Sequence, residues 1–156
     1  MSAGPWDWRT GAAKLRATHP RHILFLCVAN SARSQMAEGI ARALAPQGVK
    51  VSSAGSSPAS VRQQAIEALK EIGIDISGQR SKGLDSIDAG SVDAVITLCA
   101  EEVCPVFLGK ADRIHWGLPD PAAVTGTEET RLNAFRSIRD ELRRRLKVLF
   151  GQGEES

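Results

Sequence analysis

The sequence contains no tyrosine, and aromatic residues make up only 4% of its 156 residues. This scarcity argues against a surface that stacks nucleic-acid bases, because such surfaces rely on aromatic platforms. The formal net charge is only +2, which gives no strong general attraction to nucleic acid or to a membrane surface. We therefore predict that the protein binds neither nucleic acid nor membrane.

Long apolar segments are also missing from the sequence. No stretch is long enough to span a bilayer, and residues 1–21 lack the apolar segment of a secretory signal. The three cysteines Cys27, Cys99 and Cys104 are an odd number, which makes a poor disulfide framework. These absences predict a cytoplasmic protein whose thiols stay reduced unless a reaction oxidises them.

The chain has the length of one ordinary domain, which we predict to span residues 22–156. Residues 1–21 carry two glycines and two prolines and predict a peripheral or flexible extension, with a short helix over residues 12–17. This extension also holds Trp6 and Trp8, which we expect to pack on the domain, although a contact surface is the alternative.

Apolar patterns from residue 22 onward alternate between strand and helix. The runs 23–26, 49–52 and 92–98 predict strands, with a weaker strand over 113–116. Helices are predicted over 34–44, from Ser60 to about residue 72, and over 130–150. Ser60 and Gln63 have the spacing of a capping box, and Gly73 fits a helix end. The alternation predicts a single-domain α/β fold with a four-stranded parallel sheet and helices on both faces.

The segment from Cys27 to Ser34 follows the first predicted strand and leads into the first helix of the domain. Ligands of parallel sheets bind at this edge, beyond the carboxyl ends of the strands. A loop that curls into a helix N-terminus directs several backbone N–H groups at one point, which suits a tetrahedral oxyanion. We therefore predict an oxyanion-binding loop, formed by residues Val28, Ala29, Asn30, Ser31, Ala32, Arg33 and Ser34.

Two side chains of this loop predict its chemistry. Arg33 is suited to donate a forked pair of hydrogen bonds to the bound anion. The donors that hold an anion also favour the thiolate form of Cys27, and Ser34 is placed to donate to that sulfur. Asn30 is suited to brace the loop or to take a left-handed backbone angle. The alternative is that Cys27 is merely a small buried residue at a strand end, which is common for free cysteine.

Asp120 and the cysteine pair are further candidates. Asp120 lies in a proline-stiffened loop, where it is either an acid that protonates a leaving oxygen or an ordinary turn aspartate. Cys99 follows a buried strand and is expected at the same sheet edge as Cys27. On a regular helix, Cys99 and Cys104 would be about 140° apart, too far for a disulfide without unwinding. Two buried cysteines or half of a metal site are the alternatives, but zinc-type spacing is absent.

Four segments together resemble arsenate reductases of the low-molecular-weight protein tyrosine phosphatase superfamily, of the thioredoxin-coupled type. They are residues 23–42, 53–55, 97–99 and 115–121, and the run 30–38 is the most specific. The extension over residues 1–21 has no counterpart in that family. The resemblance implies a three-cysteine relay that reduces arsenate to arsenite and needs no cofactor. Cys27 would attack arsenic, Arg33 would hold the oxyanion and Asp120 would protonate the leaving oxygen.

The resemblance also implies how the oxidation is passed on. Cys99 would attack the sulfur of Cys27 and release arsenite, and Cys104 would then attack Cys99. Thioredoxin or a glutaredoxin-type reductant would reduce the final disulfide, and phosphate is expected as an inhibitor or weak ligand. The implied role is arsenic detoxification.

Some members of the family bind potassium beside the anion loop through four oxygen ligands. Asn30, Glu38 and Ser53 match three of these ligands, but Lys82 occupies the place of the aspartate. We therefore expect the lysine ammonium to replace the cation and predict no metal site.

Two other functions remain open at this point. The first is a low-molecular-weight tyrosine phosphatase, which would use the same loop and Asp120. Against it, Ala122 stands where such phosphatases usually place an aromatic residue. The second is a non-catalytic oxyanion or redox sensor, which would need the loop but not Asp120.

Overall fold

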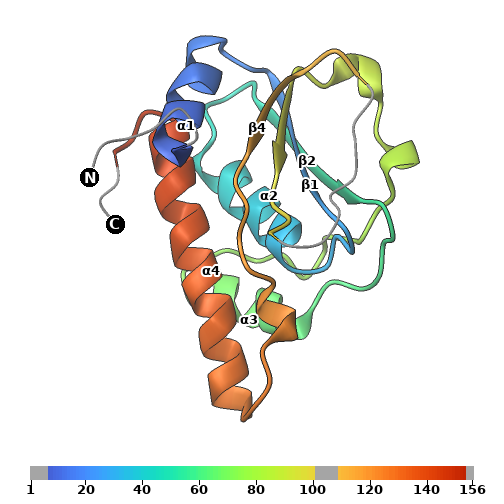
Figure 1. Ribbon diagram of the computed structural model, residues 1–156, viewed down its shortest axis with the longest axis vertical. Coiled ribbons are helices and arrows are strands. Elements are labelled where there is room, and N and C mark those ends of the chain that lie inside the picture. Colours follow the sequence, from blue (N-terminus) through green and yellow to red (C-terminus); the bar gives the residue numbers. More distant parts are fainter. Residues whose placement is uncertain (1–6, 101–108, 154–156) are drawn as a thin grey trace.

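The computed structural model describes residues 7–100 and 109–153. Its strands are β1 (His22–Cys27), β2 (Lys50–Gly55), β3 (Ala94–Thr97) and β4 (Asp112–His115). Its α-helices are α1 (Trp8–Ala17), α2 (Arg33–Leu44), α3 (Gln63–Lys70) and α4 (Glu128–Leu149). Short 3₁₀ helices are η1 (Leu84–Ser86), η2 (Ala89–Ser91) and η3 (Pro121–Ala123). Figure 1 shows the sheet seen along its edge, with α4 running along one side.

The four strands form one sheet in the order β2-β1-β3-β4, and every pairing is parallel. Phe25 of β1 lies opposite Ser53 of β2 and Ile96 of β3. Because all strands run the same way, their carboxyl ends meet at one edge of the sheet. The predicted α/β fold with a four-stranded parallel sheet is confirmed.

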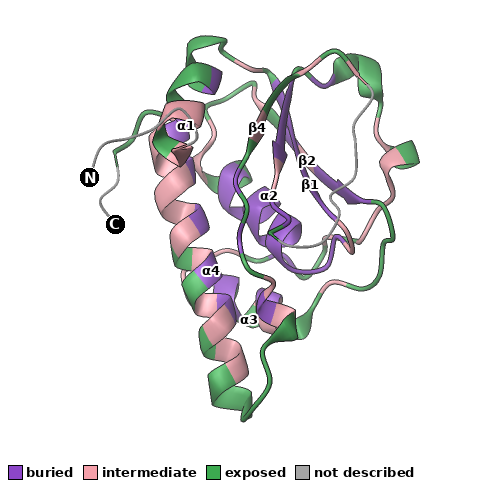
Figure 2. Ribbon diagram, in the orientation of Figure 1, coloured by how far each residue is buried: buried purple, intermediate pink, exposed green. Residues whose placement is uncertain are grey.

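Both faces of the sheet are buried, but by different elements. Ile23 and Phe25 point to a core that also contains residues of α1, α2, α3 and α4. Leu24 and Leu26 point to the opposite face, where they pack near Leu84 and residues around η1 and η2. All four described α-helices thus contribute to one core, and the helical segments on the other face are 3₁₀ turns. Figure 2 shows α2 almost entirely buried and α4 with a buried stripe.

Most predicted elements are present, with one wrong helix start. Helix α3 begins at Gln63 after Arg62, and no side chain caps it, so the predicted capping box at Ser60 is wrong. The segment before it is held instead by a loop contact, since the Arg62 N–H donates to the Ser31 carbonyl oxygen (2.9 Å). The predicted stop at Gly73 is confirmed by its left-handed φ of 82°.

Helix α1 is longer than the short helix predicted for the extension, because it begins at Trp8. Ala12 and Leu15 on its inner face are buried in the main core. Trp8 meets Trp116 edge to face, with ring centroids 6.3 Å apart. Figure 1 shows α1 beside the C-terminal end of α4. Trp6 lies outside the described residues. None of the described helices has the combined length and apolar character that a membrane span requires.

Candidate active site

The predicted oxyanion loop lies at the carboxyl edge of the sheet, between β1 and α2. Cys27 is the last residue of β1, and its side chain is buried. Its Sγ lies 2.8 Å from the hydroxyl of Ser34 in the first turn of α2. Among the described residues, Cys27 is the free cysteine. The sulfur is thus held at the base of the loop by a polar neighbour, as expected from the sequence.

The backbone of this loop is fixed by its carbonyl groups. Those of Val28, Ala29 and Ser31 accept hydrogen bonds from the segment 57–62. The donors are the N–H groups of Ser57, Ala59 and Arg62, at 2.9, 3.0 and 2.9 Å. Within the described part of the chain, the N–H groups of residues 28–32 donate to no other group. Because the carbonyl groups are engaged by the segment 57–62, these N–H groups are available as hydrogen-bond donors in an arrangement that suits an anion.

Asn30 braces the loop from behind and takes a left-handed φ of 49°. Its Nδ2 donates to the hydroxyl groups of Ser34 (2.8 Å) and Ser53 (2.9 Å). Its Oδ1 accepts from the Lys82 N–H (2.8 Å) and from Nε2 of Gln35 (2.9 Å). The side chain is fully buried, so each of these bonds forms out of water, where an unpaired polar group would be costly. Asn30 therefore fixes the curvature of the loop.

A buried carboxylate completes this network. Glu38 accepts a short hydrogen bond from the hydroxyl of Ser53 and an ion pair from Arg42 Nη2 at 2.6 Å. The Lys82 ammonium lies 3.5 Å from the same carboxylate. The Lys82 ammonium thus lies beside Glu38, where the sequence analysis expected it to take the place of a cation. Among the described residues, no three or more His, Cys, Asp or Glu side chains are grouped to hold a metal ion.

Gly55 and Gln35 support the loop but were not among the predicted site residues. A Cβ on Gly55 would collide with the Val28 carbonyl oxygen and lie 2.9 Å from the Asn30 nitrogen. A glycine at the end of a strand often marks such a close backbone approach, so the sequence held a signal for it. Gln35 Nε2 also donates to the Asn30 and Arg80 carbonyl oxygens, both at 3.0 Å. No local pattern marks Gln35 as the link between Asn30 and Arg80, because Arg80 is distant in sequence.

A cavity of about 190 Å³ lies inside the loop. It is lined by Cys27, Val28, Ala29, Ser31, Ala32, Arg33 and Asp120. The structure thus brings Asp120 to the same cavity as Cys27 and Arg33. Asn30 and Ser34, also predicted for the loop, do not line the cavity and support it from behind.

Arg33 and Asp120 are held by the backbone around the cavity. Arg33 is buried, and its Nη1 donates to the carbonyl oxygens of Leu118 (2.9 Å) and Leu98 (3.4 Å). Asp120 Oδ1 accepts from the Ala122 N–H at 3.0 Å and caps η3. A buried guanidinium between two carbonyl groups favours an anion beside it. The carboxyl of Asp120 faces the same cavity as that charge.

The sheet brings the Asp120 loop to the cavity. Beyond β4, the N–H of Trp116 donates to the Thr97 carbonyl (2.8 Å), and that of Leu118 donates to the Leu98 carbonyl (3.1 Å). Trp116 and Leu118 are both buried, which fixes this segment against the core. The chain therefore leaves the sheet only at Pro119, directly before Asp120.

Cys99 lies at the carboxyl edge beside the loop but does not line the cavity. It follows Leu98, whose N–H donates to the Leu26 carbonyl at 2.9 Å on the adjacent strand β1. Its side chain is buried, and it is disulfide-bonded. Cys104 lies outside the described residues. The expected placement of Cys99 at the same sheet edge as Cys27 agrees with the structure.

Comparison with known proteins gives the family of this chain. The family model described as "Low molecular weight phosphotyrosine protein phosphatase" matches residues 22–155. The chain belongs to this family. Residues 1–21 precede the part that matches.

Several relatives that are 40–46% identical to this chain are named arsenate reductases. An arsenate reductase of Bacillus subtilis is 46% identical over 134 residues, which cover 85% of this chain and 96% of that protein. A solved arsenate reductase "in the phosphate binding state" is 34% identical with a TM-score of 0.69, covering 85% of this chain and 98% of the other. A thioredoxin-dependent arsenate reductase of Corynebacterium glutamicum is 29% identical with a TM-score of 0.58, covering 86% of this chain and 66% of the other.

Proposed function

We propose that this protein reduces arsenate to arsenite. The observation that carries the proposal is the free thiol of Cys27 at the base of a loop whose N–H groups have no partner among the described residues. The cavity of about 190 Å³ is smaller than the roughly 300–1,000 Å³ of pockets for drug-sized ligands. It suits a small inorganic oxyanion, and relatives that are 40–46% identical are named arsenate reductases.

The first step of the proposed reaction forms a bond between sulfur and arsenic. The Cys27 thiolate attacks arsenic, while Arg33 and the loop N–H groups hold the remaining oxygen atoms. One arsenate oxygen leaves as water after Asp120 donates a proton to it. Ser34 donates to the sulfur and favours the thiolate before the attack. Phosphate is expected to compete at this loop as a weak ligand.

The second step transfers two electrons to arsenic. Cys99 takes part once the external dithiol has reduced its disulfide. The Cys99 thiolate then attacks Sγ of Cys27, and the electron pair of the sulfur–arsenic bond stays on arsenic, which leaves as arsenite. Cys104 then attacks the Cys99 sulfur, which restores the Cys27 thiolate and forms a Cys99–Cys104 disulfide. An external dithiol, from thioredoxin or a glutaredoxin-type protein, takes up this oxidation. A reaction that cycles through free thiols needs a reducing compartment, so we place the protein in the cytoplasm.

The activity is tested by arsenate-dependent NADPH oxidation with purified protein. The assay is run once with thioredoxin and thioredoxin reductase, and once with glutathione, glutaredoxin and glutathione reductase. We expect turnover with at least one system, and none without arsenate or with Cys27→Ser. No turnover in either system, with the protein folded, would refute the proposal.

The cysteine relay is tested separately from the activity. Cys104→Ser should reduce one equivalent of arsenate per chain in a single turnover but fail in steady state, because the Cys27–Cys99 disulfide is no longer resolved. Cys99→Ser should release no arsenite from the loop. Full steady-state turnover by Cys104→Ser would contradict the relay while leaving arsenate reduction intact.

A tyrosine phosphatase activity is the second candidate, because the family is named for it. It would use Cys27, Arg33 and Asp120 through a cysteinyl-phosphate intermediate and would not need Cys104. Ala122 follows Asp120-Pro121 and offers no aromatic ring to stack on the phenol of phosphotyrosine. We expect only slow hydrolysis of p-nitrophenyl phosphate. Fast hydrolysis that Cys104→Ser leaves unchanged would favour the phosphatase.

A sensor without catalysis is distinguished by Asp120→Ala. Arsenate reduction should fall by about 10²–10⁴-fold, the usual range for loss of a general acid, while phosphate still binds. A variant that binds phosphate and reduces arsenate at the original rate would remove Asp120 from the mechanism.

A further inference from the structure

A second, larger pocket lies at the opposite edge of the sheet, where β1 begins. Its volume is about 540 Å³, within the range of roughly 300–1,000 Å³ that is typical of organic-ligand sites. Strand β1 runs from His22, next to this pocket, to Cys27, which at about 3.3 Å per residue separates the two by roughly 17 Å. A ligand in the pocket therefore does not compete for the oxyanion loop.

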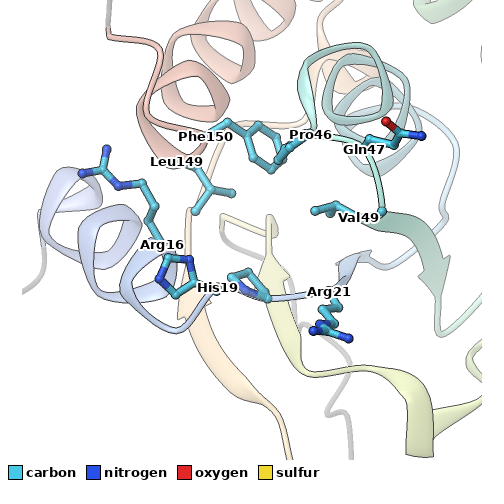
Figure 3. Close-up of a pocket in the computed structure, with 10 residues that line it drawn as sticks. Arg16, His19, Arg21, Pro46, Gln47, Val49, Leu149 and Phe150 are labelled. Atoms are coloured by element: carbon cyan, nitrogen blue, oxygen red, sulfur yellow. The ribbon is translucent and has the colours of Figure 1, made fainter.

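One side of this pocket is apolar. Leu149 and Phe150 at the end of α4 face Pro46 and Val49 from the loop between α2 and β2. Figure 3 shows Leu149 and Val49 directed toward the space between these segments, with the ring of Phe150 beside Pro46. Phe150 and Val49 are partly exposed, so water now covers part of this wall. An apolar body that displaced this water would gain the free energy of burial.

The other side of the pocket is basic. Arg16, His19 and Arg21 line it, and none of the described residues that line the pocket is acidic. These three side chains make no hydrogen bond or ion pair within the described chain, and all three are exposed. Figure 3 shows Arg16 directing its guanidinium away from the apolar wall, with His19 and Arg21 along the rim. An anionic group at the rim would meet the guanidinium charges of Arg16 and Arg21 and could accept a hydrogen bond from the His19 ring.

The backbone of this basic segment is fixed although its side chains are free. The N–H of Arg21 donates to both Asp93 carboxylate oxygens (3.1 and 3.0 Å), and its carbonyl accepts from the Lys50 N–H (2.7 Å). Asp93 is thus engaged by backbone groups. The long side chain of Arg21 remains free to turn over the mouth of the pocket.

His19 is held in an unusual conformation. Its φ is 52°, one of two positive values among the described residues other than glycine, and the second belongs to Asn30 in the oxyanion loop. Glycine would take this turn after α1 without steric cost. The histidine keeps a ring at the rim despite the steric cost of this backbone conformation, and such backbone outliers are concentrated at functional sites.

We propose that this pocket binds a small organic anion with an apolar body, such as a medium-chain carboxylate. The apolar body lies between Leu149, Phe150 and Val49, and the anionic head meets His19 and Arg21. All three basic residues precede residue 22, where the match to the family begins. The basic side of the site therefore comes from this chain's extension, and the site is independent of the proposed reduction.

The test is a titration of the ¹⁵N-labelled full chain with octanoate, followed by amide chemical shifts. We expect saturable shifts confined to residues 16–21, 46–49 and 149–151, with the loop 27–34 unmoved. Octanamide, which has the same chain without the charge, should bind at least about tenfold more weakly. Inorganic phosphate should bind weakly at this pocket, because it has no apolar body.

Variants assign the anionic head to named side chains. Arg21→Gln should weaken octanoate binding about tenfold, whereas the control Arg131→Gln, partly exposed on α4 and outside the pocket, should not change it. His19→Gly keeps the left-handed turn while removing the ring, so it should fold normally and weaken binding severalfold. Equal binding of octanoate and octanamide, or no effect of Arg21→Gln, would overturn the proposal.

The acidic chain end is the competing occupant. If deletion of Glu154–Ser156 shifts the same amide signals that octanoate shifts, these residues fill the pocket and the proposal fails. If the shortened chain binds octanoate as the full chain does, the external anion is supported.

Discussion

The two edges of the sheet hold an arginine side chain in different ways. At the carboxyl edge, Arg33 is buried and its guanidinium is fixed by two carbonyl groups. At the amino edge, Arg21 is exposed and only its backbone is fixed. A fixed charge favours catalysis, because the side chain does not have to reorganise when the reacting anion binds. A free charge favours adaptable binding, since its side chain can follow the ligand.

The two edges also differ in the hydrogen bonds that support their side chains. Asn30, Ser34, Ser53 and Glu38 form a continuous buried network behind the oxyanion loop. No comparable network supports Arg16, His19 and Arg21, whose side chains have no partner among the described residues. Small changes behind the carboxyl edge should therefore alter the reaction strongly, whereas changes at the amino edge should alter binding or stability alone.

The largest effect is expected from Gly55→Ala. The added Cβ would collide with the Val28 carbonyl oxygen and push the loop out of position. A displacement of about 1 Å at a reacting group can cost roughly 10²-fold in rate, so we expect at least that loss of arsenate reduction. Gly78→Ala is the matched control, because a Cβ there meets nothing within 4 Å. Equal rates for the two variants would show that the loop tolerates movement.

Trp8→Ala should affect stability far more than rate. The ring packs on Trp116 and lies under the guanidinium groups of Arg9 (4.5 Å), Arg144 (5.4 Å) and Arg145 (5.3 Å). Loss of a partly buried aromatic side chain should lower the free energy of unfolding by about 2 kcal/mol and Tm by about 4–8 °C. Calorimetry measures Tm, with Lys14→Ala, exposed on α1, as the control.

The rate of Trp8→Ala at 25 °C should stay within about twofold of the original. The bond from Arg33 to the Leu118 carbonyl remains, so the Asp120 loop is still held. A rate loss of tenfold or more would show that the extension positions the active site, and the contrast between the two edges would fail.

A smaller effect is expected from exchanging potassium for sodium. The Lys82 ammonium lies 3.5 Å from Glu38, so the carboxylate already has a cation. The rate of arsenate reduction should therefore change by less than about 1.5-fold between the two salts at equal ionic strength. Lys82→Ala should lower the rate a few-fold, because Arg42 alone then faces the buried charge. Strong activation of the unaltered protein by potassium would contradict this role of Lys82.

The smallest effect is expected from Glu71, which lies at neither edge of the sheet. Hydrogen bonds from Arg136 and Arg139 lower the pKa of Glu71 to about 2, which links the end of α3 to α4. This carboxylate stabilises the fold above its unfolded pKa of about 4.5, and the contribution is lost as pH falls toward 2. Glu71→Gln should lower Tm slightly at pH 7 because the site is exposed, and this difference should shrink at pH 3. A difference that grows on acidification would reverse the predicted sign.

The order of the elements was predictable because the signals are local. The apolar run 23–26 predicted β1, and the stripe from Leu132 to Leu149 predicted α4. The loop between β1 and α2 was predictable for the same reason, since Cys27 and Arg33 flank one strand-to-helix turn, whereas its binding of an oxyanion stays a prediction. The predicted start of α3 was wrong, because the Ser60–Gln63 spacing fits a capping box. In the structure, a hydrogen bond from the Arg62 N–H to the Ser31 carbonyl oxygen holds the chain before α3.

The sequence by itself determined the parallel α/β fold, the loop with Cys27 and Arg33, and the left-handed stop at Gly73. Each of these depends on residue periodicity or on backbone angles within a few neighbouring positions. Only the tertiary structure decided that Gly55 lies under the loop, that Asp120 reaches the Cys27 cavity and that helix α1 completes a basic pocket. These contacts join residues far apart in sequence, and the order in which strands pair and helices pack decides which of them meet.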